Sequence, residues 1–480
     1  MGAPSRRPLW AALAAVTVAA LALRLPYLGN QSLWYDETFT RYIAMAPSLD
    51  SLWFRVKLTE GTPPLYYLVT WAWAKAFGAG SDASLRATAG IAGAACAPVA
   101  FLALRRFVGD WPAIAAAAIV AVSPMLGWYA LDARSYSLLV LLALLSLWAL
   151  SLLLEGPTPR RWAAWALAAA AALWTHYFAA FLVAAEVAVL LWWMREARLR
   201  VLAWSAVVAL LAAPLLSVLS AQSDARTDHI GSLPLGERLE QAVRQLAMGP
   251  NPPRAWLEAI GLVLLGAGVV GGVVVAVRRE ARARPLVAIA AIAVAVPLVL
   301  SITDVEDRLL ARNLLVVFPC LAGLAGLALT RLRAVPLAAY LAVAVATIVW
   351  VEADWRYQNP DWRAAAEALP RRAAGAPVVA FPALERPVAG IYLRRRPAGG
   401  TVTAQTVWLV VEPAREDRRD LAPVPVEPVV PPDFARVSTR SVHGFRLIEL
   451  RNPNGPARFV REAFGRDVLG EPPTLMIPLR

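Results

Sequence analysis

The sequence has few charged residues, almost no lysine and almost no cysteine. Of its 480 residues, 17% are charged and 59% are hydrophobic, whereas soluble domains have roughly 25% charged and 45–50% apolar residues. This composition excludes a soluble globular chain and a disordered one. Only Lys57 and Lys75 are lysines, so nearly all basic residues are arginines, a usage typical of a GC-rich bacterial genome. Because Cys96 and Cys320 lie in apolar runs, neither a disulfide framework nor a zinc site is predicted.

Sequence motifs that bind nucleotides or metals are also missing. The chain has no GxxxxGK(S/T) loop, no convincing strand–GxGxxG–helix pattern and no HExxH sequence, which argues against ATP or nucleotide-sugar chemistry. It has only three histidines: His176, His229 and His443. We expect that no cofactor is required; a divalent metal ion is compatible with the sequence, but nothing in it implies one.

Long apolar runs fill most of the first 350 residues. A straight membrane-spanning helix needs ~20 apolar residues, and eleven runs approach or reach that length: 9–25, 86–104, 111–128, 136–154, 161–175, 177–193, 200–220, 254–277, 285–302, 309–330 and 334–350. The sequence therefore predicts a mainly α-helical, polytopic membrane bundle of about eleven spans over residues 1–350.

The arginines indicate how this bundle is oriented. Cytoplasmic loops accumulate Arg and Lys, and with the amino terminus inside, every basic cluster of the bundle falls on the inner side. These clusters hold fifteen arginines: Arg6, Arg7, Arg105, Arg106, Arg160, Arg161, Arg195, Arg198, Arg200, Arg278, Arg279, Arg282, Arg284, Arg331 and Arg333. The predicted topology is N-in and C-out, and the net charge of +13 reflects membrane orientation more than nucleic-acid binding.

This orientation requires that residues 63–77 do not cross the membrane. The segment is apolar and rich in aromatic residues, and we interpret it as a juxtamembrane or re-entrant helix within a first outer loop of residues 26–85. The alternative is a complete short span, which would put all later basic clusters outside.

Residues 351–480 differ in composition and are predicted to form a separate, water-facing domain. They hold 34 charged residues, against 47 in the first 350. A helix-like stretch at 361–369 is followed by β-like runs at 377–381, 406–411 and 445–450, so a small extracytoplasmic α/β fold is expected.

With this topology, the uncommon polar residues gather on the outer side of the membrane. They form five groups: Trp34-Tyr35-Asp36-Glu37, Thr62-Pro63-Pro64-Leu65-Tyr66-Tyr67, Asp132-Ala133-Arg134-Ser135-Tyr136, His176-Tyr177 and the stretch from Asp304 to Arg312. A single charge at a membrane boundary is usually an anchor. Five such groups, opposite inner loops that are almost purely arginine, favour a functional site.

These motifs resemble those of the bacterial GT-C glycosyltransferases over residues 1–350. More narrowly, the chain is similar to the family-39 and aminoarabinose-transferase-like group, which is related to the dolichyl-phosphate-mannose protein mannosyltransferases. The resemblance implies inverting transfer of a sugar from a polyprenyl-phosphate donor to a glycan, lipid or protein acceptor, at the outer face of the bacterial plasma membrane. One departure is Thr62, where relatives often have His or Lys before Pro-Pro-Leu.

An acceptor hydroxyl needs a base that removes its proton as the glycosidic bond forms. Asp36 is the candidate, and Glu37 orients it, binds the acceptor or raises the pKa of Asp36 through like-charge proximity. The alternative for both carboxylates is an ordinary solvated loop.

The leaving lipid phosphate needs fixed positive charge, and the arginine fork suits two phosphate oxygens. Arg134, with Tyr136 as an amphipathic contact, is the first candidate. Arg308 and Arg312, spaced by four residues, are the second, although Arg308 is as well explained by pairing with neighbouring acids. Further residues are predicted to line the site: Pro64, Tyr66, Asp132 and His176. For His176, a polar cap of the bundle is the alternative.

Two other functions fit parts of the pattern. A cell-envelope polysaccharide polymerase or ligase with a diphosphate-linked donor would be expected to place arginines in a large outer loop. Loop 221–253 contains only Arg226, Arg238 and Arg244. A lipid or sugar transporter would place polar residues along a path through the bilayer, often in repeated halves. Glu186, within an apolar run, is the residue that such a path would use, although helix–helix hydrogen bonding explains it equally well.

Overall fold

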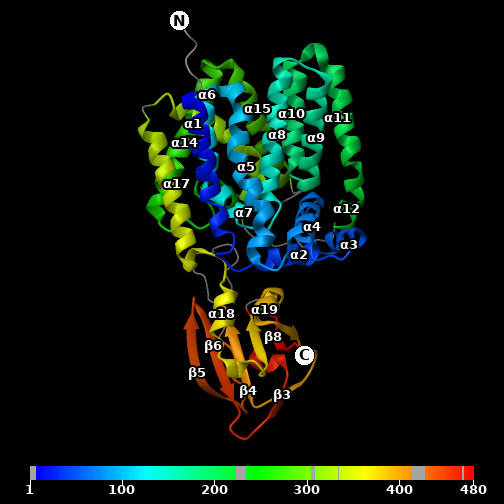
Figure 1. Cartoon of the computed structure of the whole chain (residues 1–480), viewed down its shortest axis with the longest axis vertical. Coiled ribbons are helices and arrows are strands. Elements are labelled where there is room, and N and C mark those ends of the chain that lie inside the picture. The colour runs from blue at the N-terminus through cyan, green and yellow to red at the C-terminus, as the bar shows by residue number, and fades with distance from the viewer. Residues whose placement is uncertain are drawn as a thin grey trace. The chain divides into compact units, whose positions relative to one another are not determined.

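The structure is a computed structural model of the whole chain, shown in Figure 1. It describes residues 7–222, 234–303, 309–332, 334–412, 427–467 and 470–479. The chain forms two compact units. The first contains residues 1–29 and 40–351, and the second contains residues 30–39 and 352–480. Residues 30–39, which the sequence analysis placed in the first outer loop, thus fold with the carboxyl-terminal domain.

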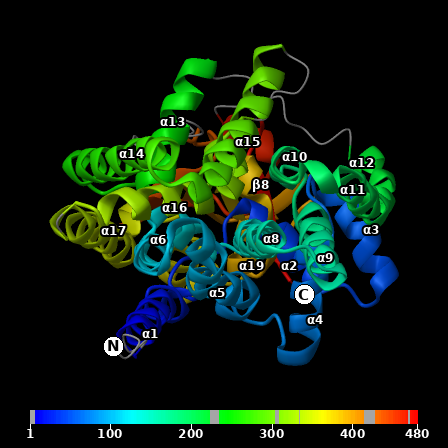
Figure 2. The same ribbon diagram turned by 90° about the horizontal axis from the view of Figure 1, so that it is seen from above.

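The first unit is a bundle of helices formed by the predicted apolar runs. Its helices include α1 (Arg7–Ala22), α5 (Asp82–Val108), α6 (Asp110–Val122), α7 (Pro124–Ala130), α8 (Tyr136–Glu155), α9 (Pro159–Thr175), α10 (Ala179–Trp193), α11 (Arg198–Ala212), α12 (Leu216–Ala221), α13 (Leu235–Met248), α14 (Ala255–Arg278), α15 (Arg284–Ile302), α16 (Phe318–Leu329) and α17 (Val335–Ala353). Figure 2 shows α16 inside the bundle, where it packs against α6, α14 and α15.

Within the described ranges, eight helices are long and apolar enough to cross a membrane, or nine if α6 and α7 form one bent span. These two helices meet at 53° because Pro124 follows Ser123, whose hydroxyl accepts the Leu126 N–H at 3.3 Å and caps α7. The remaining two predicted runs, α9 and α10, have only 17 and 15 residues. Eleven spans therefore remain a prediction.

The basic clusters lie together at one end of the bundle. Arg106 in the last turn of α5 pairs with Glu155 at the end of α8, at 2.9 Å. Arg331, which follows α16, pairs with Glu280 after α14, at 2.5 Å. The start of α1 lies at the same end in Figure 1. The predicted one-sided arrangement of arginines is present, while the cytoplasmic location of that end stays a prediction.

Two short helices, α3 (Leu49–Thr59) and α4 (Leu65–Phe77), lie at the opposite end (Figure 1). The 13 residues of α4 extend about 20 Å, which is less than the ~30 Å hydrocarbon core. Neither helix is among the candidate spans. Their buried side chains Leu52, Val56, Tyr66 and Tyr67 form a small core together with neighbouring residues such as Ile43 and Ala89.

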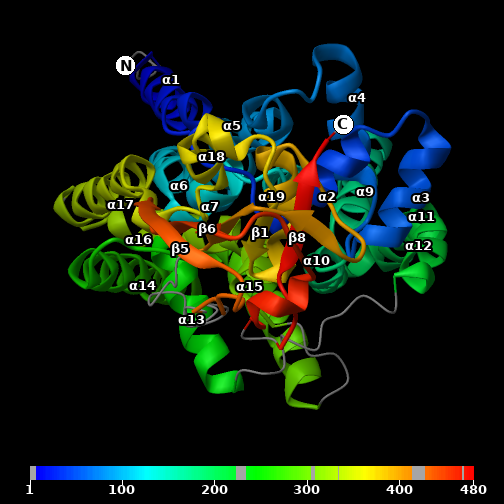
Figure 3. The ribbon, with the colours of Figure 1, turned by 90° about the horizontal axis from the view of Figure 1, so that it is seen from below.

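The carboxyl-terminal domain is built on a mixed sheet (Figure 3). Its six strands have the order β2-β8-β1-β4-β6-β5, where β1 and β4 are parallel and the other pairs are antiparallel. The strands are β1 (Val378–Phe381), β2 (Arg395–Pro397), β4 (Thr406–Val411), β5 (Ala435–Val442), β6 (Phe445–Arg451) and β8 (Thr474–Pro478), and a separate pair is formed by β3 (Val402–Ala404) and β7 (Ala457–Phe459). The three strands that the sequence predicted correspond to β1, β4 and β6, which lie next to one another in this sheet.

Apolar side chains cover both faces of this sheet. On one face, helices α18 (Trp362–Ala368) and α19 (Arg386–Leu393) contribute Trp362 and Val388 to a buried cluster. On the other face, Phe434, Phe459 and Phe464 pack against a second cluster. A sheet buried on both faces explains why β4 is a continuous apolar run. The predicted small α/β domain is therefore present.

Close contact between α14 and α16 depends on one glycine. A Cβ atom at Gly272 would lie 2.0 Å from the Leu324 carbonyl oxygen, whereas nothing lies within 4 Å of such an atom at Gly266 in the same helix. We expect Gly272→Ala to force the helices apart and lower the melting temperature of the detergent-solubilised protein by several degrees. The matched Gly266→Ala should leave stability unchanged or raise it by about 0.5–1 kcal/mol. Equal melting temperatures for the two variants would contradict this packing.

Candidate functional site

Arg134 lies in the short connection between α7 and α8. The helix α7 ends at Ala130, and the Arg134 N–H donates to the Asp132 carbonyl at 2.7 Å, which folds the connection into a tight turn before Tyr136 begins α8. Asp132 and Arg134 are 3% and 8% exposed. The predicted motif is thus a buried turn between two helices, and it holds its charged side chains away from water.

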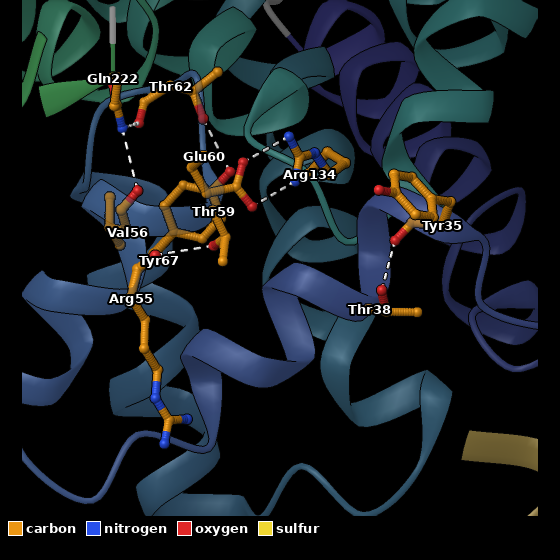
Figure 4. A network of polar contacts seen from close by, with 10 residues as sticks. All are labelled: Tyr35, Thr38, Arg55, Val56, Thr59, Glu60, Thr62, Tyr67, Arg134 and Gln222. Carbon is orange, nitrogen blue, oxygen red and sulfur yellow. Dashed lines mark hydrogen bonds and ion pairs between the residues drawn. The ribbon is translucent and has the colours of Figure 1, made fainter. Parts of the chain in front are cut away.

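The guanidinium of Arg134 is paired with Glu60, as Figure 4 shows. Arg134 Nη1 and Nη2 donate to the two Glu60 carboxylate oxygens at 2.8 and 2.9 Å. The Glu60 side chain is 1% exposed and that of Arg134 is 10% exposed. Two parallel charge-assisted hydrogen bonds are the geometry in which arginine binds a carboxylate or a phosphate most strongly. The sequence analysis did not foresee this pair.

A polar network surrounds the loop that carries Glu60 (Figure 4). The hydroxyls of Thr62 and Tyr67 are 2.9 Å apart. Gln222, at the end of α12, donates to the carbonyls of Val56 and Thr62 at 3.3 and 3.1 Å, and its own carbonyl accepts from Tyr177 at 2.8 Å. Thr62, the residue at which the sequence departs from the family pattern, is therefore hydrogen-bonded to Tyr67 on α4 and to Gln222 after α12. Gln222 had no signal in the sequence, because a lone amide near a helix end has no periodicity.

Tyr67 lies beside the ion pair, with its ring centroid 6.0 Å from the Arg134 guanidinium carbon. Burial is the largest influence on its phenol and raises the pKa well above the usual value, while the positive charge of Arg134 opposes this effect. The phenol therefore stays protonated at neutral pH and serves as a neutral hydrogen-bonding group next to two charges.

His176 lies in the turn between α9 and α10, close to Tyr136 at the start of α8. Its ring centroid is 5.7 Å from that of Tyr136, which in turn lies 4.4 Å from Tyr129. Burial, followed by the positive charges of Arg312 and Arg134, lowers the pKa of His176 to about 3. The imidazole is therefore neutral at neutral pH, and the charges of both arginines reach it.

Among the predicted phosphate ligands, Arg312 is in the 3-10 segment Ala311–Val317 that leads into α16, and it is partly buried. Arg308, the other candidate of this pair, lies outside the described residues. The structure thus brings Arg134, Tyr136, His176 and Arg312 together in the first unit.

Pro64 and Tyr66 are also in the first unit, at the start of α4. Both are buried, and Tyr66 packs edge-to-face on Tyr67 with ring centroids 5.6 Å apart. Because Tyr66 belongs to the small core around Leu52 and Val56, it has a clear structural role. Its predicted place in lining a ligand site stays a prediction.

Asp36 and Glu37 lie in the second unit, in the first turn of α2 (Tyr35–Ala44). Glu37 is fully buried, and its carboxylate accepts the Trp34 N–H at 3.2 Å. This is the reciprocal half of a capping box, in which the third helical residue satisfies the backbone before the helix. Asp36 is only partly buried and points from a different side of the helix. The adjacent carboxylates thus have different environments.

Glu186 is buried inside the bundle. Its carboxylate accepts the hydroxyl of Ser146 on α8 at 2.5 Å and the indole N–H of Trp165 on α9 at 2.8 Å. The side chain therefore links α10 to two neighbouring helices, as the helix–helix alternative for this residue expects.

In the part of the chain that the structure describes, no three His, Cys, Asp or Glu side chains gather as metal ligands. That the protein requires no metal ion stays a prediction.

Comparison with known proteins adds independent information on the fold. Residues 61–220, a third of the chain, match the family described as dolichyl-phosphate-mannose-protein mannosyltransferase. No curated protein matches the sequence. The structure is similar to ArnT from Cupriavidus metallidurans in the apo state, with a TM-score of 0.56 and 16% identity over 93% of this chain and 98% of that chain. For ArnT bound to undecaprenyl phosphate the values are 0.55 and 15%, over 91% and 97%.

These similarities confirm the predicted fold class, a GT-C helix bundle with a small carboxyl-terminal sheet domain. They also confirm the resemblance to the ArnT-like group of GT-C glycosyltransferases. Since the bundle contains several long apolar helices and has the fold of a membrane protein, the chain is a multi-pass membrane protein.

The buried Glu60–Arg134 pair leads to a prediction about stability. Removing one partner leaves a buried charge without its counterion, which typically costs about 3–5 kcal/mol. We expect Glu60→Ala and Arg134→Ala each to lower the melting temperature of the purified protein clearly, and the double variant Glu60→Ala/Arg134→Ala to lose much less than the sum. A double-mutant cycle from thermal unfolding in detergent measures this coupling. Strictly additive losses would show that the two charges do not stabilise each other.

Proposed function

We propose that this protein is a glycosyltransferase that moves a sugar from a polyprenyl-phosphate donor to a hydroxyl acceptor. One observation carries the proposal: the buried His176, whose ring lies 5.7 Å from that of Tyr136, has its pKa lowered by the charges of both Arg134 and Arg312, within a fold shared with ArnT, which has been solved with undecaprenyl phosphate. Two arginines beside aromatic rings suit a lipid phosphate, because the guanidinium binds oxygens while the rings contact apolar chain.

Arg134 and Arg312 are the proposed phosphate ligands, with Tyr136 as an amphipathic contact. Arg134 is paired with Glu60, so the donor phosphate would enter an arginine site that also holds a carboxylate. A phosphate can replace this carboxylate or share the fork with it, since guanidinium has five N–H donors. Charge that grows on the leaving phosphate is then stabilised by cations that are already in place.

Asp36 is the proposed general base, in a single inverting displacement. The acceptor oxygen forms a bond to the anomeric carbon as the bond from that carbon to the phosphate oxygen breaks, and the acceptor proton passes to the Asp36 carboxylate. Glu37 supports this assignment indirectly, because its carboxylate is fully buried and accepts the Trp34 N–H, whereas Asp36 is only partly buried. No metal ion is needed in this scheme.

The proposed location is the bacterial plasma membrane, with the polar site and the carboxyl-terminal domain on the outer face. The arginines collected at the other end of the bundle support this orientation, because such clusters mark the cytoplasmic side. The acceptor is proposed to be a glycan, a glycolipid or a protein, and the transferred sugar a hexose or a pentose.

The base assignment predicts the effect of one isosteric change. Asp36→Asn keeps the size of the side chain but cannot take a proton, so transfer should fall by about 10²–10⁴-fold in protein that inserts and melts normally. The matched control is Asp50→Asn, which changes an exposed aspartate in the first turn of α3 and should leave the rate unchanged. Retained transfer by correctly inserted Asp36→Asn protein would remove Asp36 from this role.

The phosphate assignment predicts a loss of donor binding that is separate from stability. The double variant Glu60→Ala/Arg134→Ala removes the buried pair as a unit, and its KM for a polyprenyl-phosphate sugar should rise at least ~10-fold, the size of a lost charge-assisted hydrogen bond. Release of free polyprenyl phosphate from a panel of donors measures this. Arg279→Ala, which changes an exposed arginine at the other end of the bundle, is the control.

The same donor panel tests the alternative function. If the wild-type protein turns over no monophosphate donor but accepts a diphosphate-linked one, a cell-envelope polysaccharide polymerase or ligase replaces the proposed transferase. An unchanged donor KM in Glu60→Ala/Arg134→Ala would move the phosphate site away from Arg134.

A further inference from the structure

Residues 30–39, which contain Asp36, are part of the carboxyl-terminal unit although they lie more than 300 residues from it in sequence. We propose that the carboxyl-terminal domain is the positioning element of the transferase: Ser32, Asp361 and Tyr392 hold the segment 30–39, and thereby the Asp36 carboxylate, in a fixed conformation. This inference rests on the proposed function of Asp36 as the base, and it gives the domain a role that neither its composition nor its sheet suggests.

The strongest link is made by Ser32. Its hydroxyl donates to Asp361 Oδ1 at 2.9 Å and accepts the Arg363 N–H at 3.0 Å. Asp361 Oδ1 also accepts the Ala364 N–H at 3.0 Å, as the cap of α18, and Asp361 Oδ2 lies 2.7 Å from His443 Nδ1. One serine therefore joins the segment to the start of α18 through both its donor and its acceptor.

The environment of Asp361 keeps this carboxylate charged. Burial alone raises its pKa, but hydrogen bonds from the Ala364 N–H, His443 and Ser32 outweigh that effect and lower the pKa below its usual value. A permanently charged acceptor forms stronger hydrogen bonds than a neutral one. The Ser32 contact is therefore present throughout the neutral pH range.

Backbone contacts hold the residues on either side of Ser32. The Leu33 N–H donates to the Tyr392 hydroxyl on α19 at 2.6 Å. The Gln31 side chain donates to Glu352 at 3.0 Å, and the Gln31 carbonyl accepts from the Arg363 guanidinium at 3.2 Å. Three consecutive residues of the segment are thus each bonded to the carboxyl-terminal domain.

Tyr35, two residues after Leu33, also packs against the carboxyl-terminal domain. Its ring packs on the apolar cluster beneath the sheet that includes Trp362, Val388 and Phe445, and it lies edge-to-face on Phe39 with ring centroids 5.0 Å apart. Tyr35 is also the first residue of α2 and immediately precedes Asp36. The start of the helix is therefore set by packing within this domain.

These contacts fix the backbone directly before Asp36. Four of the five residues from Gln31 to Tyr35 bond or pack to the carboxyl-terminal domain, and the fifth, Trp34, bonds to Glu37. A displacement of a catalytic group by ~1 Å can reduce a rate ~10²-fold even when the change lies far from the chemistry. Loosening Ser32 or Tyr392 should therefore slow the chemical step without touching the donor.

The test compares four variants of the full-length protein with polyprenyl-phosphate sugar as substrate. Ser32→Ala and Tyr392→Phe each remove one hydroxyl, and both should lower kcat about tenfold while the donor KM stays unchanged. Ser438→Ala is the matched control, because its hydroxyl donates to the Glu449 carboxylate at 3.1 Å in the same domain but away from the segment. Ser32→Thr, which restores the hydroxyl, should recover most of the rate.

Two further measurements separate positioning from a general loss of structure. Hydrogen–deuterium exchange of the Leu33 amide should rise in Tyr392→Phe, while melting temperatures stay within the range of Ser438→Ala. In the Asp36→Asn background, Ser32→Ala should produce no further loss of kcat, because its effect acts through Asp36.

The outcomes distinguish this inference from the proposed function. If Asp36→Asn is inactive but Ser32→Ala and Tyr392→Phe turn over at the wild-type rate, the base assignment stands and positioning by the domain is wrong. If Asp36→Asn is itself active, the proposed function fails first. If Ser32→Ala raises the donor KM or slows Asp36→Asn further, the contact acts on something other than the base, and the inference is overturned.

Discussion

The Glu60–Arg134 pair is the constraint on which the polar end of the bundle depends. Both charges are withdrawn from water, so each needs the other, and breaking the pair exposes a large desolvation penalty. The pair joins the loop before α4 to the turn before α8. Because both helices begin within five residues of these charges, their starting points are fixed together, and the core of α3 and α4 is held against the longer helices.

The same constraint sets what the site can do with a donor. An arginine that pointed into water would bind phosphate without losing a protein contact. In Arg134, two N–H groups already donate to the Glu60 carboxylate. For the proposed donor, the phosphate would therefore compete with the Glu60 carboxylate for the guanidinium or share it, and Arg312 would add positive charge nearby. Such a site would favour an anionic headgroup over a neutral lipid, because only a charged group compensates the arginine for weaker contact with Glu60.

The sequence predicted those parts of the structure that leave a pattern of hydrophobic or charged residues along the chain. Apolar runs predicted the helices of the bundle, and short β-like runs predicted β1, β4 and β6. The edge strand β5 was missed because its exposed polar residues resemble a loop. The partner of Arg134 was missed because Glu60 is 74 residues away, and a lone carboxylate in a loop has no pattern. The fold of residues 30–39 with the carboxyl-terminal domain was missed for the same reason, since hydrogen bonds through Ser32 and Tyr392 depend on tertiary structure alone.

The two neighbouring carboxylates show how a local rule divides chemical roles within one sequence motif. Asp36 and Glu37 are equivalent by charge and by distance along the chain. Once Tyr35 packs on the apolar cluster and α2 begins there, the longer side chain at Glu37 reaches back to the Trp34 N–H, as the third helical residue does in a capping box. Successive helical residues point ~100° apart, so Asp36 is directed to another side and keeps partial access to solvent. The packing of one tyrosine therefore decides which of the two acids can serve as a base.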